Sequence, residues 1–285
     1  MKFFTEIDIP SSPVRITRDS RLTLLGSCFA DQMGARLQRA GMNACVNPFG
    51  TLYNPVSVAN AAARLCSDAG FGPDDCVEMG AEAGLVCSFS HHTSFARSSV
   101  QEFLDNANAS LHEAAAFWGQ SDIVIITLGT SFCYMRDGEV VANCLKRSAS
   151  EFSRTMLSPG QSASVLSAMV RRNPDKFFVF TVSPIRHLSD GAHANSLSKA
   201  ALLQAVDELT HSFPERCLYF PAFEIMMDEL RDYRFYAQDL VHPNDQAADY
   251  IWEKFSSCFI PDSETEYMKA AEKLYRAGQH RPLHP

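Results

Sequence analysis

The segment Asp239-Leu-Val-His242-Pro243 carries two side chains that could act together in catalysis. On a tight loop, residues three apart can present a carboxylate and an imidazole on one side. The aspartate then accepts a hydrogen bond from one ring nitrogen and leaves the other nitrogen free as a base. In an isolated Asp-x-x-His, a capping aspartate beside a surface histidine is the commoner interpretation. The catalytic interpretation is favoured here because the first loop of the same chain holds a candidate nucleophile.

That first loop is the segment Gly26-Ser27-Cys28-Phe29-Ala30. Its glycine permits a sharp turn from a strand into a helix, and the next residues then stand at a helix N-terminus, which favours negative charge. A thiol or hydroxyl there is easier to ionise, so we expect a depressed pKa for the Cys28 thiol. A helix cap followed by a buried thiol is the structural alternative, and it would be favoured if this segment stood alone.

The elements that must position these residues follow from the apolar pattern of the chain. Short apolar runs predict strands at 21–26, 42–46, 123–128, 177–182 and 217–220, and periodic spacing predicts helices at 29–40, 56–66, 100–118, 161–171, 196–212 and 245–258. Such alternation predicts a parallel sheet with helices on both faces. Ligands bind at the carboxyl ends of parallel strands. Four turn-rich segments fall there: GSCFA, NPFG, LGTSF and QDLVHPN.

Together these segments resemble the GSCFA family, within the SGNH (GDSL-like) hydrolase superfamily, from about Arg21 to Phe255. The resemblance is carried by GSCFA, VNPFGTLYNP, IITLGTSFCY, VVANC, TVSPIRHLSDG and MDELRDYRFYAQDLVHP, in this order. It implies a flavodoxin-like three-layer α/β/α sandwich that hydrolyses acyl esters without a cofactor, with a carbohydrate O-acetyl group as the favoured substrate. Acyl transfer by the same residues, and a non-catalytic carbohydrate-binding or regulatory protein that keeps the fold, remain the alternatives.

The resemblance also implies roles for individual residues. The superfamily's first block places the nucleophile two residues after its glycine, which is Cys28 here; a turn shifted by one residue would make Ser27 the nucleophile instead. The Asp-x-x-His block matches Asp239 and His242. The implied mechanism is therefore a Cys/Ser-His-Asp relay with an acyl-enzyme intermediate.

Oxyanion donors are implied by two further blocks. The glycine of the second block matches Gly50 in Asn47-Pro-Phe-Gly, and its backbone N–H would bind the oxyanion. The third block of the superfamily reads Gly-x-Asn, whereas this chain has Gly129-Thr130-Ser131, so the asparagine donor is absent. A hydroxyl of Thr130 or Ser131 could substitute for it. Losing one such donor weakens transition-state binding by about 3 kcal/mol.

Three other polar residues are weaker candidates for substrate contacts. His91 and His92 could reach substrate or cap a strand, and Arg186 could hold an anionic group or form a structural ion pair. The nine histidines show no His-Glu-x-x-His or comparable spacing, so we predict no catalytic metal.

Composition narrows the class of protein. A net charge of −8 makes nucleic acid an unfavourable partner, and 46% hydrophobic residues supply a sizeable core. The nine cysteines form no close pairs, which indicates free thiols in a reducing compartment. No segment approaches the apolar length of a secretory signal or a membrane span, so a cytoplasmic protein without membrane contact is expected. We expect one domain over 1–260 and a peripheral extension over 261–285, with a small ester as ligand; the oligomeric state stays open.

Overall fold

Five parallel strands form the central sheet of the computed structural model, which describes residues 4–67, 69–80 and 84–279. These strands are β1 (Arg21–Gly26), β2 (Asn43–Val46), β5 (Ile123–Leu128), β9 (Phe177–Val182) and β10 (Cys217–Tyr219). Their order in the sheet is β10-β9-β5-β1-β2, and every pairing is parallel. Numbered along the chain, this is the flavodoxin-like order 2-1-3-4-5. The predicted fold class, a three-layer α/β/α sandwich, is confirmed.

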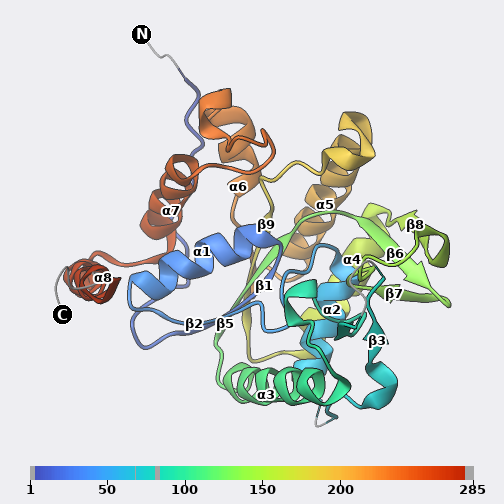
Figure 1. Cartoon of the computed structure of the whole chain (residues 1–285). Coiled ribbons are helices and arrows are strands. Elements are labelled where there is room, and N and C mark those ends of the chain that lie inside the picture. The colour runs from blue at the N-terminus through green and yellow to red at the C-terminus, as the bar shows by residue number, and fades with distance from the viewer. Residues whose placement is uncertain (1–3, 68, 81–83, 280–285) are drawn as a thin grey trace.

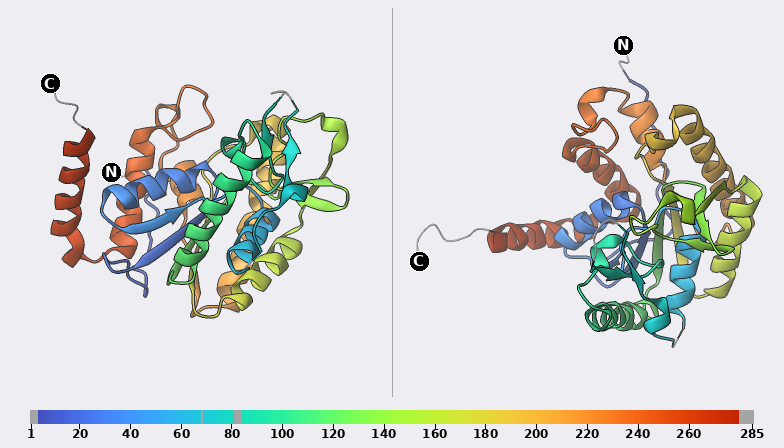
Figure 2. Two further views of the ribbon diagram at one scale, coloured as in Figure 1. Left: turned by 60° about the horizontal axis from the view of Figure 1, so that its bottom comes forward. Right: turned by 45° about the vertical axis from the view of Figure 1, so that its right-hand side comes forward.

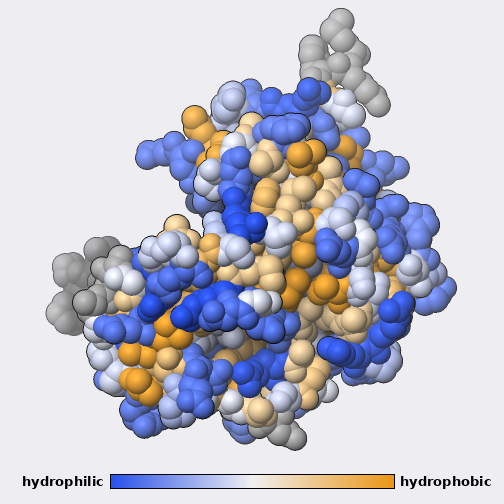
Figure 3. All heavy atoms as spheres, turned by 90° about the vertical axis from the view of Figure 1, so that its right-hand side faces the viewer, coloured by the Kyte–Doolittle hydropathy of each residue, from blue (hydrophilic) through white to orange (hydrophobic). Residues whose placement is uncertain are grey.

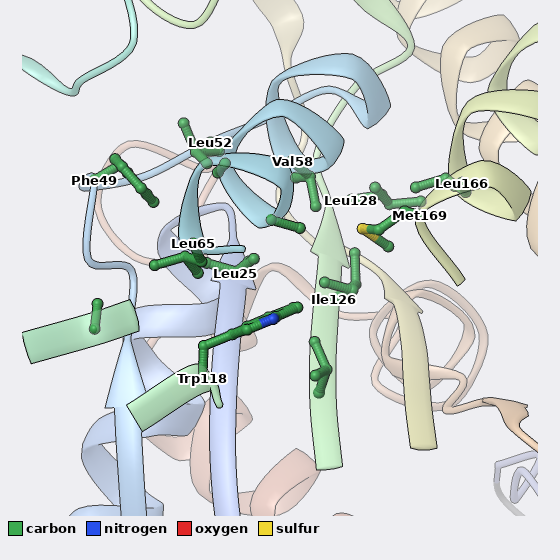
Figure 4. Packing of buried hydrophobic residues seen from close by; sticks show 14 of the residues in the cluster. Leu25, Phe49, Leu52, Val58, Leu65, Trp118, Ile126, Leu128, Leu166 and Met169 are labelled. Atoms are coloured by element: carbon green, nitrogen blue, oxygen red, sulfur yellow. The ribbon is translucent and has the colours of Figure 1, made fainter. Parts of the chain in front are cut away.

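Helices cover both faces of this sheet (Figure 1). The helices of the described residues are α1 (Cys28–Arg39), α2 (Pro55–Leu65), α3 (Val100–Trp118), α4 (Pro159–Arg172), α5 (Ala192–Ser212), α6 (Ala222–Glu224), α7 (Asp245–Phe259) and α8 (Thr265–Gln279), the last of which stands beside the sheet (Figure 2). One buried cluster lies against α1 and α7, and the other lies against α2, α3, α4 and α5. The second cluster is seen in Figure 4, where Trp118 and Met169 lie close to β5.

The central strands supply both clusters because side chains alternate across a sheet. In β5, Ile123 and Ile125 belong to the cluster beside α1, whereas Val124, Ile126 and Leu128 belong to the cluster beside α2. A strand that is apolar on both faces can only lie in the middle of a covered sheet. For this reason the apolar run Ile123–Leu128 by itself indicates a strand in the middle of the sheet.

A second, antiparallel sheet follows β5 and was not predicted. It consists of β6 (Phe132–Arg136), β7 (Glu139–Val141) and β8 (Ser153–Met156), in the order β7-β6-β8. A two-stranded ribbon joins β3 (Val77–Glu78) to β4 (Val86–Cys87). These strands and α5 occupy the right-hand side of Figure 1; seen from there, hydrophobic atoms form a band between hydrophilic areas (Figure 3).

Several short turns complete the chain. The 3-10 turns are Pro73–Asp75, Thr93–Phe95, Ala149–Glu151, Leu188–Asp190, Tyr233–Phe235 and Asp262–Glu264, and a π turn at Ile225–Glu229 continues α6. All nine cysteines are free thiols. Within the described residues, no helix is long and apolar enough to cross a membrane.

The C-terminal helix α8 stands beside the domain and projects from it in Figure 2. The hydroxyl of Tyr267 donates to the carbonyl of Gly41 at 2.9 Å, and Arg18 pairs with Glu264 at 2.8 Å. Of the extension predicted over 261–285, residues 280–285 lie outside the described residues. The helix contacts the end of α1 that lies away from the carboxyl ends of the strands, and the peripheral role of the extension stays a prediction.

Candidate active site

A cavity of about 430 Å³ lies where the strand order reverses between β1 and β5. This is the position at which open α/β sheets bind ligands. Its walls come from the loops after β1, β2, β5 and β9, from the antiparallel sheet and from the loop before α7. The lining includes Cys28, Tyr53, Asn54, Thr130, Phe132, Tyr134, Asn143, Cys144, Arg154, Ile185, His187, Asp190, Val241 and His242.

Three of the predicted residues meet at the wall of this cavity, where Cys28 and His242 belong to the lining and Asp239 contacts His242. The sulfur of Cys28 lies 3.5 Å from Nε2 of His242, and Nδ1 of His242 lies 2.6 Å from Oδ2 of Asp239. The other carboxylate oxygen accepts the backbone N–H groups of Val241 (2.9 Å) and His242 (3.0 Å). Leu240 takes the left-handed conformation, with φ of 58°, which lets the chain turn back on itself. The loop thus holds carboxylate and imidazole in one orientation.

These contacts decide which ring nitrogen of His242 carries the proton. The backbone N–H groups of His242 and Val241, and then the imidazole, lower the pKa of Asp239 to about 2. An ionised carboxylate can only accept, so Nδ1–H of His242 donates to it and Nε2 carries a lone pair. That lone pair faces the Cys28 thiol, which donates to it. The arrangement can move a proton from sulfur to imidazole.

The first loop places Cys28, and not Ser27, beside the histidine. Gly26 has φ of 149°, and a Cβ there would lie 2.2 Å from the carbonyl oxygen of Thr127, so only glycine fits. Ser27 follows as the fully buried N-cap of α1, and its hydroxyl accepts the N–H of Phe29 at 3.3 Å. Cys28, the first residue of α1, is partly exposed to the cavity.

The expected depression of the Cys28 pKa is wrong. Burial raises the pKa of this thiol, and the charge of Asp31 raises it further. The N–H groups of Cys28 and Phe29 and the charge of Lys199 act in the opposite direction and do not compensate. The thiol at rest is therefore neutral, and the helix N-terminus alone does not ionise it. Its activation depends on a base, which the geometry supplies in His242.

The residues of the NPFG loop hold the backbone in place and are not free donors. The N–H of Gly50 donates to the carbonyl of Asn47 at 2.7 Å, which closes a turn, so the oxyanion donor expected at Gly50 is already engaged. The side chain of Asn47 accepts the N–H of Gly26 at 2.8 Å and donates to Asp31 at 2.6 Å. Asn47 thus ties the first loop to the second, and neither residue lines the cavity.

The Gly129-Thr130-Ser131 segment is engaged in a similar way. The N–H groups of Gly129 and Thr130 both donate to the carbonyl of Tyr53, at 2.8 and 2.9 Å. The hydroxyls of Thr130 and Ser131 lie 3.0 and 3.2 Å from that of Ser198. Ser131 is fully buried, and Thr130 is the member of this segment that lines the cavity. No free hydroxyl of Ser131 replaces the missing asparagine.

The three weaker candidates lie away from the cavity lining, so their predicted substrate contacts are not formed there. His91 is fully buried among Phe71, Phe95 and other rings, and burial lowers its pKa to about 4. His92 caps the turn Thr93–Phe95, where its ring accepts the N–H of Ser94. Arg186 interacts with the phenol of Tyr236. Each serves the local structure.

Several residues at the site were missed by the sequence pattern. Lys199, on α5, is fully buried, and its Nζ donates to the carbonyls of Gly129 and Ser183 at 2.7 Å each. In the cavity lining, Arg154 also forms an ion pair with Asp190. The positions of Lys199, Arg154 and Asp190 in the sequence do not indicate these contacts, which form only in the folded chain.

His187 also lines the cavity, and its Nε2 is buried without a hydrogen-bond partner among the described residues. Burial, and then the charge of Lys199, lower the pKa of His187 to about 4, so this imidazole is neutral. Across the described ranges, no group of three or more histidine, cysteine, aspartate or glutamate side chains could hold a metal ion.

Fold and site together define an α/β protein with a Cys-His-Asp arrangement at the carboxyl edge of a flavodoxin-like sheet. The sequence matches the GSCFA family over residues 21–255, and the chain belongs to that family. No curated protein matches the sequence.

Solved structures that resemble the chain include the following two. One is described as a platelet activating factor from Streptococcus pneumonia: 10% identity, TM-score 0.38, with 86% of this chain and 85% of the other covered. The other is an acetyl xylan esterase from the rumen bacterium Butyrivibrio proteoclasticus: 10% identity, TM-score 0.39, with 86% and 64% covered.

Proposed function

We propose that the protein hydrolyses acyl esters through a thioester formed on Cys28, as an SGNH-type hydrolase with a cysteine nucleophile. One observation carries the proposal: Cys28, His242 and Asp239 form a continuous hydrogen-bonded series of 3.5 and 2.6 Å at the wall of a cavity. A nucleophile, a base and a residue that orients the base are the parts that acyl transfer requires.

The reaction would proceed in two halves. His242 takes the thiol proton as the sulfur attacks the carbonyl carbon, and the C=O electron pair moves to oxygen. Collapse of this intermediate breaks the C–O bond to the leaving alcohol, which receives the proton from His242, and a thioester remains on Cys28. Water then attacks the thioester while His242 takes its proton. Release of the carboxylic acid returns that proton to the thiol.

Hydrolysis is favoured over acyl transfer because water can reach the base. The side chain of His242 is 41% exposed, and that of Asp239 is 50% exposed. Water can therefore reach a thioester on Cys28 beside this imidazole, and it is present at a far higher concentration than any other acceptor. Transfer to another acceptor would require a site that excludes water from this imidazole.

The cavity supports a small acyl group on a hydroxylated leaving group, with a carbohydrate acetate as the favoured case. In the lining of the same cavity as Cys28, the Arg154–Asp190 ion pair offers both donors and acceptors to hydroxyl groups. The guanidinium of Arg154 lies over the rings of Phe132 and Tyr134, at 4.0 and 5.2 Å from their centres, and is thereby held in place. The aromatic rings can contact the C–H groups of a sugar ring, and the neighbouring ion pair can bind its hydroxyl groups.

The test is ester turnover followed with p-nitrophenyl acetate and octanoate, and with acetate release from an acetylated monosaccharide. We expect the acetyl esters to be turned over in preference to the octanoyl ester. The variants Asp239→Asn and His242→Ala should remain folded and lose turnover by about 10³-fold or more. If the wild type turns over none of these esters, the protein is a binder that keeps the fold; preferential turnover of octanoate would reject the acetyl assignment.

A further inference from the structure

The missing asparagine of the third block leaves the proposed reaction without an evident side-chain donor for the oxyanion. The N–H groups of Gly50, Gly129 and Thr130 all donate to backbone carbonyls. The hydroxyls of Thr130 and Ser131 lie within hydrogen-bond distance of Ser198. A tetrahedral intermediate on Cys28 therefore needs a donor from another part of the cavity wall.

Asn54 lies in that wall, together with Cys28 and His242. The chain that carries it runs directly beside the first loop, because the N–H of Leu52 donates to the carbonyl of Gly26 at 2.8 Å. The neighbouring carbonyl of Tyr53 accepts the N–H groups of Gly129 and Thr130. Asn54 is thus held between the loop that carries the nucleophile and the loop from which the expected asparagine is absent.

The orientation of the Asn54 amide is fixed by its role as the N-cap of α2. Its Oδ1 accepts the N–H of Ser57 at 2.9 Å, so the amide cannot rotate without losing the cap. This leaves the NH₂ group on the other side. Asn54 is almost fully buried, yet its Nδ2 donates to no residue in the described part of the chain and is not sealed in the interior. Since the residue lines the cavity, this NH₂ group is the donor that Asn54 can offer to a ligand there.

We propose that the side-chain amide of Asn54 donates to the oxyanion of the tetrahedral intermediate, and so replaces the asparagine missing after Gly129. The inference rests on the proposed acyl-ester chemistry at Cys28. The backbone N–H of Cys28, the first residue of α1, supplies the second donor. One side chain then has two functions: its oxygen begins a helix and its nitrogen binds the charge that develops on the substrate.

The two functions separate by substitution. Asn54→Ser keeps an oxygen for the Ser57 N–H but removes the amide donor, whereas Asn54→Ala removes both. We expect kcat/KM for p-nitrophenyl acetate to fall about 10²–10³-fold in both variants, with the loss in kcat and little change in KM. Only Asn54→Ala should lower the urea midpoint. Asn60→Ser, the same substitution at an exposed position of the same helix, is the matched control and should keep wild-type turnover.

Two further readouts distinguish an oxyanion role from a disturbed nucleophile. Alkylation of Cys28 by iodoacetamide, followed on its own peptide by mass spectrometry, develops no oxyanion and should proceed within about twofold of wild type in Asn54→Ser. A trifluoromethyl ketone adds to a thiol to give a hemithioketal whose oxygen mimics the oxyanion. Its adduct, followed by ¹⁹F NMR, should form at least tenfold more weakly in Asn54→Ser than in the wild type.

The outcomes are decisive for each proposal. If Asn54→Ser keeps turnover and ketone affinity while Cys28→Ala loses both, Asn54 is only a helix cap and the esterase proposal stands. Equally slowed alkylation and turnover would mean that the substitution acts through the thiol, which overturns the oxyanion role. If wild-type protein forms neither acetate nor ketone adduct, the proposed function fails and the role of Asn54 with it.

Discussion

The neighbouring residues Ser27 and Cys28 have opposite environments that follow from one glycine. Gly26 bends the chain against β5, so the next side chain turns inward to cap α1 and the following one faces the cavity. Swapping their roles would require a shift of the turn by one residue. The close approach of Gly26 to the Thr127 carbonyl leaves no room for that shift.

The assignment of the nucleophile is tested by two alanine variants. Cys28→Ala should lower ester turnover by about 10³-fold or more, because the attacking sulfur atom is lost. Ser27→Ala should cost about 1 kcal/mol of stability through the lost N-cap and keep most of the turnover. Initial rates with p-nitrophenyl acetate and urea unfolding curves measure both. The reverse order of activities would make Ser27 the nucleophile.

The raised pKa of Cys28 predicts how its reactivity depends on pH. A raised pKa favours the neutral thiol, so alkylation at neutral pH should be slow and should increase as the pH rises. Asp31→Asn removes a negative charge that raises this pKa, so the midpoint of the alkylation profile should move to lower pH. The rate is measured on the Cys28 peptide, because Cys66 is more exposed and also reacts.

The matched control is Asp105→Asn, a surface aspartate on α3, which should leave the profile unchanged. An unchanged midpoint in Asp31→Asn would show that burial alone sets the thiol pKa. A midpoint below the ordinary range of thiols in the wild type would restore the thiolate expected from the helix N-terminus.

At the scale of elements, two buried lysines donate hydrogen bonds to backbone carbonyls at the two ends of the central strands. Lys199 donates to the carbonyls of Gly129 and Ser183, just past the carboxyl ends of β5 and β9. Lys176 donates to the carbonyls of Trp118 and Ser121, which lie before the start of β5. The candidate active site lies at the first end only, so the two lysines separate effects on stability from effects on the proposed activity.

Replacing each lysine by methionine should therefore give different results. Lys199→Met leaves two carbonyls without a donor, whereas Lys176→Met leaves only that of Ser121, because the Trp118 carbonyl still accepts the N–H of Ser121. Each unmet buried group costs about 1–3 kcal/mol, so we expect losses in urea unfolding of about 2 kcal/mol or more for Lys199→Met and of about 1 kcal/mol or more for Lys176→Met. Lys199→Met should also lower kcat/KM, because Gly129 adjoins the catalytic cavity, whereas Lys176→Met should retain it. Loss of turnover in both variants would mean that any destabilisation of the sheet disturbs the site.

The same lysine gives a pH dependence of stability. Burial lowers the pKa of Lys199 to about 7, from an ordinary value of 10.5. Between these values the unfolded chain binds a proton that the folded chain does not, so this group makes stability rise with pH over that window. The neutral amine retains two N–H bonds, enough for its two carbonyls. Relative to the wild type, Lys199→Met should lose this rise between pH 7 and 9.

The sequence predicts those strands and helices whose residue pattern fits one environment only, such as a strand that is buried on both faces. The runs Arg21–Gly26, Ile123–Leu128 and Phe177–Val182 are strands with the predicted bounds. Each is a short, mainly apolar run that ends at or before a glycine or a polar residue, which is typical of a strand covered on both faces. The sheet of β6, β7 and β8 was missed, since strands of three to five half-exposed residues carry no clear alternation.

The site shows the same limit. Asp239 and His242 could be paired from sequence because three residues and one loop determine their geometry. Lys199 could not, because a lysine in an alanine-rich helix resembles a surface residue until the strand ends pack over it. Arg154 and Asp190 meet only through the tertiary fold. His91 and His92 were candidates for substrate contacts because imidazoles often serve in catalysis. The rings of four phenylalanines surround His91, and the sequence around it does not show this.

At the scale of the whole molecule, the candidate active site and the C-terminal helix α8 lie at opposite edges of the sheet. The cavity opens at the carboxyl edge, whereas the contact of α8 with Gly41, the turn between α1 and β2, lies toward the amino edge. The family match ends at residue 255, before this helix begins. Much of α8 is exposed, including Leu274. These facts predict that α8 adds stability and no chemistry.

A chain lacking residues 265–285 tests that division. Its loss exposes the surface under Met268 and removes the Tyr267 hydroxyl bond and the contact of Arg18 with the Tyr267 ring. Contacts of this size contribute on the order of 2 kcal/mol, so Tm should fall by about 3–4 °C for a chain of this length. Turnover of p-nitrophenyl acetate at 25 °C should remain within about twofold of the full chain, because no atom of the cavity is touched. A tenfold loss of kcat/KM in a truncated protein that still unfolds cooperatively would instead make α8 part of the catalytic domain, since a helix at the amino edge could influence the nucleophile only by setting the position of α1.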